Sequence, residues 1–424
     1  MHLQAPLPIF LTSFQLAVTL PPTHHTCLMI ERRNRLWISD LQTNGISTTT
    51  NVVDWDERRI VNISGPTKLF PDDEEVEIQV LDRYIDLLSP CAHSLEVDDQ
   101  GLLISVSSDP KDDTTCVVNY PHYSDVPSLS DCHTVELSRL VEVDRLGPGV
   151  DLVQYSDETG HKKKVVFKYS IIFQRLRFTW SELHMLKTIP RHPNLVALDC
   201  IVVGDAEARI VGFTTGYIPG KTLDRDKGRV FRLAWLQQLT ATVDYLNLER
   251  GIIHQDIAPR NIIIDLEDKL RLFDFDRAVA AGGSWVVPER NDIDGVVFTL
   301  YEIVTHNDEF SAHHFNGQGR DVVLNLKDWD IKAKLDTDLS LFRQHLTSWI
   351  AQRAKPNQAL RVQQVSNPDE PPRGRIIVDM DEAGTPIYDD PPYQTRVKAL
   401  EFGQNVVSWE RPPYHKMYPI SPEE

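Results

Sequence analysis

One stretch of the chain, residues 251–265, constrains the fold more than any other. It runs Gly-Ile-Ile-His-Gln-Asp-Ile-Ala-Pro-Arg-Asn-Ile-Ile-Ile-Asp, so two apolar runs flank a short polar segment. Such runs of β-branched residues predict two buried strands joined by a loop. Asp256 and Asn261 then lie on that loop and are expected to point the same way. A base and a metal-binding amide on rigid flanks suit phosphoryl transfer.

Three further residues extend this arrangement. Asp274 follows a second buried run that begins at Leu270. Upstream, Lys168 ends the predicted strand of residues 164–169, and Glu182 lies fourteen positions later on a helix predicted for residues 179–188. A lysine paired with a glutamate would supply a local cation for nucleotide phosphates.

In this order and spacing, the motifs resemble those of eukaryotic protein kinases. The loop from His254 to Asn261 resembles the catalytic loop, and Asp274-Phe-Asp276 stands where the family has Asp-Phe-Gly. The turn His192-Pro-Asn194 resembles the one after the regulatory helix. The resemblance covers residues 140–355, and the overall texture also looks like that of the kinase-like proteins found in filamentous fungi.

The resemblance implies a nucleotide site, a base and a magnesium site. Catalytic roles fall to Asp256 as base, to Lys168 with Glu182, and to Arg260. ATP binding is expected at Gly147, Gly149, Val153 (in the adenine ceiling), Val166, Lys168, and at Thr215 and Tyr217 in the hinge of residues 213–219. Asn261 and Asp274 are the expected Mg²⁺ ligands, since magnesium prefers hard oxygen ligands. Asp292 is expected to brace the catalytic loop.

Several positions depart from the family pattern. Asp151 or Leu152 stands where the third glycine of the phosphate-binding loop is expected, and Asp276 replaces the glycine after Asp274. Within the catalytic loop, Ala258 and Gln255 replace the usual lysine and arginine. The loss of that arginine argues against control by phosphorylation of the activation segment.

The activation segment itself is short. Only residues 277–287 separate Asp276 from Pro288-Glu289, so much of the platform for a protein substrate is missing. We therefore keep three hypotheses. The first is an ATP- and Mg²⁺-dependent protein kinase acting on a hydroxyl, the second a pseudokinase that serves as an interaction scaffold, and the third a small-molecule kinase. The substrate, whether a protein or a small molecule, is not identified by the sequence.

Patterning outside the motifs divides the chain into three parts. Residues 1–138 predict a β-rich accessory domain with strands at 35–39, 75–80 and 102–106, although a ligand-binding module remains an alternative. Residues 139–355 predict an α+β, bilobal kinase-like fold, with a β-rich N-lobe (139–216) and a helical C-lobe (217–355). Residues 356–424 are rich in proline and acidic residues and predict an extended or disordered tail, or ligands for an aromatic groove.

The net charge and the cysteines limit the expected binding partners and cellular compartment. The net charge of −18 argues against nucleic-acid partners and anionic membranes. Five scattered cysteines without a CxxC spacing indicate a reducing compartment and no structural zinc. The apolar start lacks a basic region, and no run is long enough to span a membrane, so we expect a cytoplasmic or nuclear protein that is not secreted.

Overall fold

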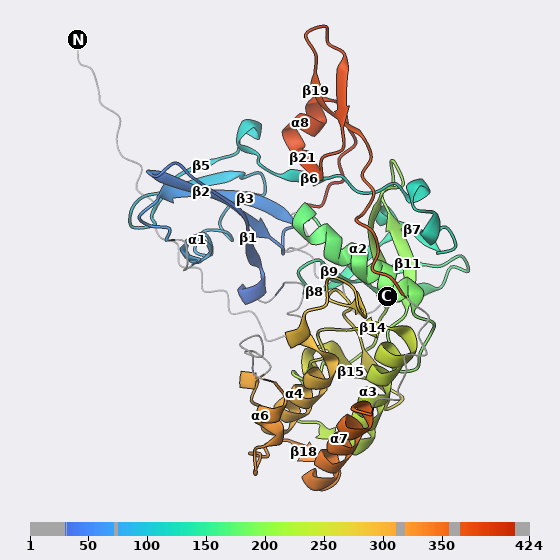
Figure 1. The fold of residues 1–424 in the computed structure, drawn as a ribbon. Helices are drawn as coiled ribbons and strands as arrows, with labels where there is room; N and C mark the ends of the chain where they lie inside the picture. Colours follow the sequence, from blue (N-terminus) through green and yellow to red (C-terminus); the bar gives the residue numbers. More distant parts are fainter. Residues whose placement is uncertain (1–29, 31, 72–74, 311–318, 356–364, 412–424) are drawn as a thin grey trace, which may run out of the picture.

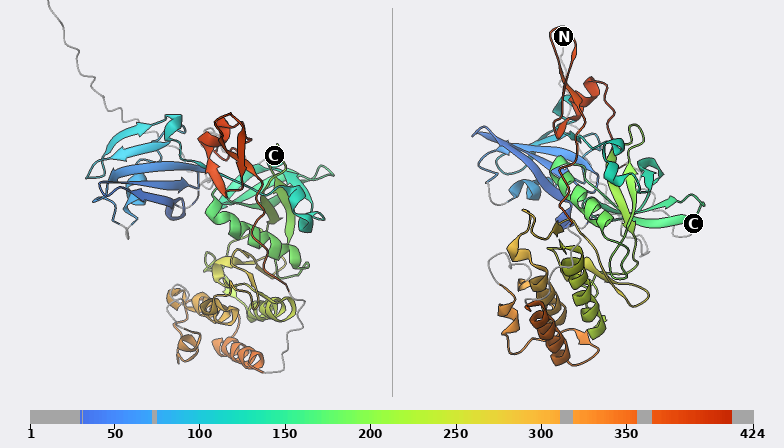
Figure 2. Two further views of the ribbon diagram at one scale, coloured as in Figure 1. Left: turned by 45° about the horizontal axis from the view of Figure 1, so that its top comes forward. Right: turned by 45° about the vertical axis from the view of Figure 1, so that its right-hand side comes forward.

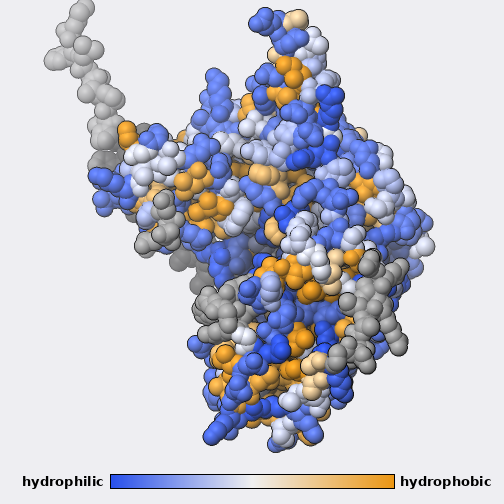
Figure 3. Space-filling model, in the orientation of Figure 1, coloured by the Kyte–Doolittle hydropathy of each residue, from blue (hydrophilic) through white to orange (hydrophobic). Residues whose placement is uncertain are grey.

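A computed structural model gives the fold and describes residues 30, 32–71, 75–310, 319–355 and 365–411. Figure 1 shows an N-terminal sheet, a central domain of two lobes, and a C-terminal region that returns to the side of the N-terminal sheet. Within these ranges, no helix is long and apolar enough to cross a lipid bilayer. The surface in Figure 3 mixes polar residues with small apolar patches.

One six-stranded sheet forms the N-lobe, in the order β7-β11-β12-β10-β9-β8. Its strands are β7 (Thr134–Glu136), β8 (Val141–Gly147), β9 (Val150–Ser156), β10 (Lys162–Tyr169), β11 (Leu198–Val203) and β12 (Ile210–Gly216). The helix α2 (Phe173–Thr188) packs against three of these strands. Because β7 pairs with β11, this sheet begins before residue 139, where the sequence placed the start of the domain.

The C-lobe is mainly helical and contains three short strand pairs in its described residues (Figure 2). Its helices are α3 (Leu233–Asp244), α4 (Asp292–Thr305), α6 (Asp321–Leu324) and α7 (Leu339–Arg353). Its strand pairs are β13 (Val230–Phe231) with β18 (Lys334–Leu335), β14 (Ile252–Ile253) with β17 (Val279–Ala280), and β15 (Ile262–Ile264) with β16 (Leu270–Leu272). Apolar side chains of α3, α4 and α7 pack into one core. The predicted bilobal α+β fold is confirmed.

The N-terminal part is a separate sheet of five strands with one short helix. The strands are β1 (Leu36–Thr43), β2 (Ser47–Asp54), β3 (Arg59–Pro66), β4 (Ser94–Val97) and β5 (Leu103–Ser107). The predicted strand at residues 75–80 is wrong, since these residues form the helix α1 (Val76–Leu81). Val80 and Leu81 are buried on the helix and share a core with Ile85, which follows at helical spacing. The expectations for residues 1–29 lie outside the described residues.

The C-terminal part corrects the prediction of an extended or disordered tail. Residues 365–411 contain β19 (Ile376–Met380), β20 (Pro386–Asp389), β21 (Tyr393–Thr395) and α8 (Arg396–Glu401). Strand β21 pairs with β6 (Cys116–Val118), which lies far upstream in the chain. Composition misled the prediction because these prolines lie outside regular strands or at their ends, where no ladder hydrogen bond is needed.

A second core joins all three parts. Trp55 of the N-terminal part and Trp409 of the C-terminal part pack with Tyr169 at the end of β10. The rings of Trp409 and Tyr169 stack with centroids 4.9 Å apart. The outer face of the N-lobe sheet is therefore covered by segments that precede and follow the kinase-like domain.

Candidate active site

The predicted catalytic loop connects β14 to β15, and one carboxylate holds it in shape. The backbone amides of His254 and Gln255 donate to the two oxygens of Asp292, each at 2.8 Å. Gln255 adopts a φ of 62°, which is uncommon for a residue other than glycine. The first residue of α4 thus fixes the bend that carries Asp256, as the sequence led us to expect of Asp292.

Asp256 lies at the centre of a small polar cluster. Its Oδ1 accepts a hydrogen bond from Arg260 at 2.6 Å, and its Oδ2 accepts one from the side-chain amide of Asn261 at 2.8 Å. Arg290 also approaches Oδ1, at 3.5 Å. The loop therefore brings together the expected base, the expected amide ligand and a cation, and Arg290 joins them without having been singled out from the sequence.

Lys168 connects the two lobes through a pair of carboxylates. Its ammonium lies 2.6 Å from Glu182 on α2 and 2.6 Å from Asp274. The backbone amide of Phe275 also donates to Glu182, at 2.9 Å. The contact between Lys168 and Glu182 that the sequence predicted is present, and it places Asp274 beside the same ammonium.

The ionisation of this cluster follows from its burial. Burial lowers the pKa of Lys168, but Asp274 and Glu182 raise it by more, so the ammonium form is favoured. Burial raises the pKa of Glu182 to about 7 even though Lys168 opposes the change. Burial also raises the pKa of Asp274, but Lys168 lowers it by more, so this carboxylate stays charged. A charged Asp274 is what a metal ligand requires.

Asp276 supplies a structural test of whether a divalent cation fits here. Its Oδ1 is buried and has no hydrogen-bond partner. Burial and the nearby charge of Asp274 both raise the pKa of Asp276. Among the described residues, no three His, Cys, Asp or Glu side chains form a preformed metal site. The unsatisfied oxygen of Asp276, near the charge of Asp274, nevertheless fits Mg²⁺, which keeps several waters and binds through few protein ligands.

The glycine-containing turn does not form an extended phosphate-binding loop. Gly147 pairs directly with Val150, so β8 and β9 form a hairpin closed by only Pro148 and Gly149. Gly149 has a φ of 68°, and a Cβ there would lie 2.4 Å from the carbonyl oxygen of Tyr169. The turn is therefore packed against the end of β10, next to the level of Lys168, which pairs with Val150.

Strand register corrects one predicted nucleotide contact. Side chains alternate along a strand, so Val166 and Lys168 share one face of β10. Val166 pairs with Leu152 on β9 and with Thr215 on β12, which places those two side chains on the same face. Val153 instead pairs with Val165 and packs in the core on the opposite face. Val153 thus faces away from Lys168, whereas Leu152 lies on the same face as Lys168.

The remaining hinge residue, Tyr217, directly follows β12 in the connection to the C-lobe. Sequence analysis missed Leu152 because strand pairing is not visible in a single sequence.

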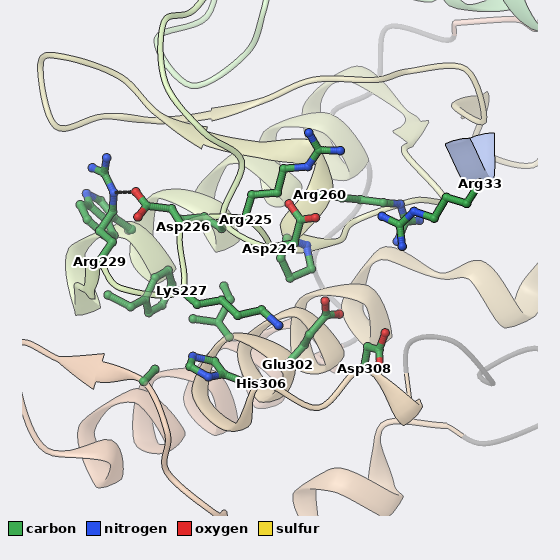
Figure 4. Close-up of a pocket in the computed structure, with 16 residues that line it drawn as sticks. Arg33, Asp224, Arg225, Asp226, Lys227, Arg229, Arg260, Glu302, His306 and Asp308 are labelled. Carbon is green, nitrogen blue, oxygen red and sulfur yellow. Dashed lines mark hydrogen bonds and ion pairs between the residues drawn. The ribbon is translucent and has the colours of Figure 1, made fainter. Parts of the chain in front are cut away.

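A polar cavity of 540 Å³ opens beside the catalytic loop. Figure 4 shows Arg33, Arg225 and Arg260 around one end of it, and Lys227, Glu302 and Asp308 toward the other. Arg33 comes from the N-terminal part of the chain, so that part contributes to the wall. Arg260 in its lining also donates a hydrogen bond to Asp256.

Comparison with known proteins agrees with this geometry. Residues 152–281 match the family model "Protein tyrosine and serine/threonine kinase". The chain carries a divergent protein-kinase-like domain. Residues of the chain are 31% identical over 124 positions to CBL-interacting protein kinase 12 of Oryza sativa subsp. japonica, covering 28% of this chain and 21% of that protein.

Two further relatives come from other organisms. Serine/threonine-protein kinase CHK1 of Saccharomyces cerevisiae is 34% identical over 88 residues, which cover 20% of this chain and 17% of that kinase. Cyclin-dependent kinase 1 of Encephalitozoon cuniculi is 26% identical over 171 residues, or 38% of this chain and 56% of that kinase. The chain thus spans about a fifth of the length of the first two kinases.

Proposed function

We propose that this protein is a phosphotransferase of the protein kinase class, which transfers the γ-phosphate of ATP to a hydroxyl group. The observation that carries the proposal is the bridge made by Lys168 between Glu182 and Asp274, next to the loop that holds Asp256 and Asn261. A lysine, a base and two oxygen ligands form the minimal set for this chemistry.

Each side chain has a distinct part in the reaction. Lys168 holds the α- and β-phosphates, and Glu182 keeps its ammonium in place. Asp274 and Asn261 would hold Mg²⁺, which would neutralise charge on the phosphates. The hydroxyl oxygen of the substrate bonds to the γ-phosphorus, and the bond from that phosphorus to the β,γ-bridging oxygen breaks. The hydroxyl proton passes to Asp256, and ADP leaves.

Arg260 has to share Asp256 with the substrate. It is half exposed and currently holds Oδ1, the oxygen that is not engaged by Asn261. When the substrate hydroxyl donates to that oxygen, the guanidinium is free to turn toward the transferred phosphoryl group. Its planar fork of donors suits a phosphate.

A scaffold without catalysis is the second candidate, and the closed hairpin at Pro148 and Gly149 favours it. Without an extended loop, fewer backbone amides reach the phosphates, which weakens nucleotide binding. The short segment of residues 277–287 equally favours a small-molecule hydroxyl over a protein substrate within the first candidate. ATP and Mg²⁺ are common to both versions of the enzyme.

Thermal denaturation with and without ATP and Mg²⁺ separates these candidates. Nucleotide at about 100 times its Kd stabilises the folded protein by about 2.7 kcal/mol, which raises the Tm measurably. Single-turnover transfer from γ-labelled ATP to a peptide library, to small hydroxyl compounds and to the protein itself then tests catalysis.

Two variants and a control complete the experiment. Asp256→Asn should slow transfer by about 10²–10⁴-fold, the range for loss of a general base, while leaving nucleotide binding intact. Asp274→Ala should abolish the stabilisation that depends on Mg²⁺. Asp268→Asn is the control, because Asp268 lies on the surface outside the site and its φ of 62° suits asparagine. No stabilisation of the wild type by nucleotide would leave only the scaffold.

A further inference from the structure

The segment of residues 277–287 (the short segment) is held by hydrogen bonds to a side-chain amide of the catalytic loop. The side-chain Nε2 of Gln255 donates to the carbonyl oxygens of Arg277 at 2.9 Å and Trp285 at 3.3 Å. Its Oε1 accepts from the backbone amide of Val287 at 2.6 Å. One neutral side chain thus binds both ends of the short segment.

A second amide, from outside the kinase-like domain, binds the middle of the short segment. The Oδ1 of Asn367 accepts a hydrogen bond from the backbone amide of Ala280 at 2.7 Å. A Cβ on Gly283 would lie only 2.5 Å from the Nδ2 of Asn367, so the absence of a side chain there makes room for the amide. Ala280 also pairs with Ile252 just before the catalytic loop. Asn367 therefore acts on the strand pair next to Asp256.

The same stretch of the C-terminal part also holds α2. The carbonyl oxygen of Asp369 accepts from the indole of Trp180 at 3.0 Å, two residues before Glu182. The guanidinium of Arg177, also on α2, lies 4.0 Å from the ring centre of Trp285 in the short segment. In Figure 1 the returning chain runs alongside α2. The helix, the short segment and residues 367–369 thus form one cluster.

We infer that Asn367 is a positioning residue for phosphoryl transfer. By holding Ala280 it fixes the short segment, and with Asp369 it keeps α2 where Glu182 meets Lys168. The ties are neutral amides rather than charges, so the arrangement needs no phosphate on Ser284, the one hydroxyl residue of the short segment. The inference rests on the proposed transferase function for its kinetic consequence, but the tie itself is independent of that function.

Two substitutions at Asn367 distinguish the effect of its hydrogen bond to Ala280 from the effect of its packing. Asn367→Leu keeps a similar volume and removes the acceptor, whereas Asn367→Asp keeps an acceptor for Ala280. Asn367→Leu should lower kcat about tenfold, as one ordinary hydrogen bond is worth about one factor of ten. It should leave the KM for ATP within about twofold, and Asn367→Asp should restore kcat. Asn405→Leu, elsewhere in the C-terminal part and bonded to Glu207, is the matched control.

Hydrogen exchange measured by mass spectrometry supplies a readout that needs no nucleotide. In Asn367→Leu the peptide containing Ala280 should exchange about tenfold faster, because its amide loses its acceptor. Gly283→Ala, whose new Cβ displaces Asn367, should reproduce both effects if the leucine variant does not fold. An unchanged exchange rate of the Ala280 peptide would refute the role of the hydrogen bond between Ala280 and Asn367. Faster exchange with an unchanged kcat would refute the positioning role of Asn367. A wild type that transfers no phosphate would defeat the proposed function, while the exchange result would still decide the tie.

Discussion

Replacing Lys168 with methionine is the sharpest test of the electrostatics between the lobes. Methionine keeps an unbranched side chain but removes the ammonium that contacts Glu182 and Asp274, each at 2.6 Å. The Lys168 side chain is only 11% exposed, so water cannot replace the lost charge. Breaking such a buried pair costs about 3–5 kcal/mol of unfolding free energy, because the partner charges stay buried.

The penalty should depend on pH with a definite sign. Burial already raises the pKa of Glu182 from 4.5 to about 7, and loss of the ammonium raises it further. Since this pKa is higher in the folded state than in the unfolded state, the folded protein binds more protons, and stability falls as pH rises through that interval. The Lys168→Met variant should therefore lose less stability at pH 5.5 than at pH 8.

Urea denaturation of both proteins at the two pH values measures this effect. Lys163→Met is the control, since Lys163 lies on the same strand but is 46% exposed and pairs with Asp199 at the surface. A surface pair of this kind contributes about 0–1 kcal/mol. The reasoning would be refuted if both variants lost equal stability, or if the loss in Lys168→Met were the same at both pH values.

Three other predictions use the same measurements. Gly149→Ala should lower the free energy of unfolding by about 1–2 kcal/mol because of the positive φ, and by more because its Cβ meets the Tyr169 carbonyl oxygen. Gly160→Ala also has a positive φ but open space around the new Cβ, so it should lose only about 1–2 kcal/mol, which comes from the backbone conformation. Trp409→Ala should cost about 2–3 kcal/mol through lost stacking and burial, which would show that the C-terminal part stabilises the N-lobe. Burial lowers the pKa of His184 from 6.5 to about 4, so its contribution is complete above pH 6.5 and lost as pH falls through 4. His184→Leu should flatten the stability profile over that range by up to about 3 kcal/mol.

Local features of the fold followed well from the sequence. The helix predicted for residues 179–188 lies within α2 and ends at the same residue, although α2 begins earlier, at Phe173. Periodic apolar patterns decide such elements without help from the rest of the chain. Residues 75–80 show the limit, because a short apolar alternation fits both a strand and a helix, and packing against the N-terminal sheet selects the helix.

The candidate site also has features that the sequence predicted and features that it did not. The loop that brings Asp256 and Asn261 together was predictable, since five residues of sequence set their separation. The contact of Lys168 with Glu182 also followed from motif order. By contrast, choosing Leu152 over Val153 requires the register between β9 and β10. Pairing across strands depends on the whole sheet and leaves little trace in a single sequence.

Two departures from the kinase pattern, the replacement at Asp151 and the shortened segment of residues 277–287, lie against other parts of the chain. Asp151 would repel phosphates if it faced the site, but it is fully buried on the opposite face, between Arg145 and Arg58 of the N-terminal part. Gly149 packs near Trp55, also from that part. Asn367 of the C-terminal part ties the short segment. Segments on both sides of the kinase-like domain thus contact Asp151, the turn at Gly149 and the short segment, so the replacement at Asp151 and the shortened segment do not by themselves argue against catalysis.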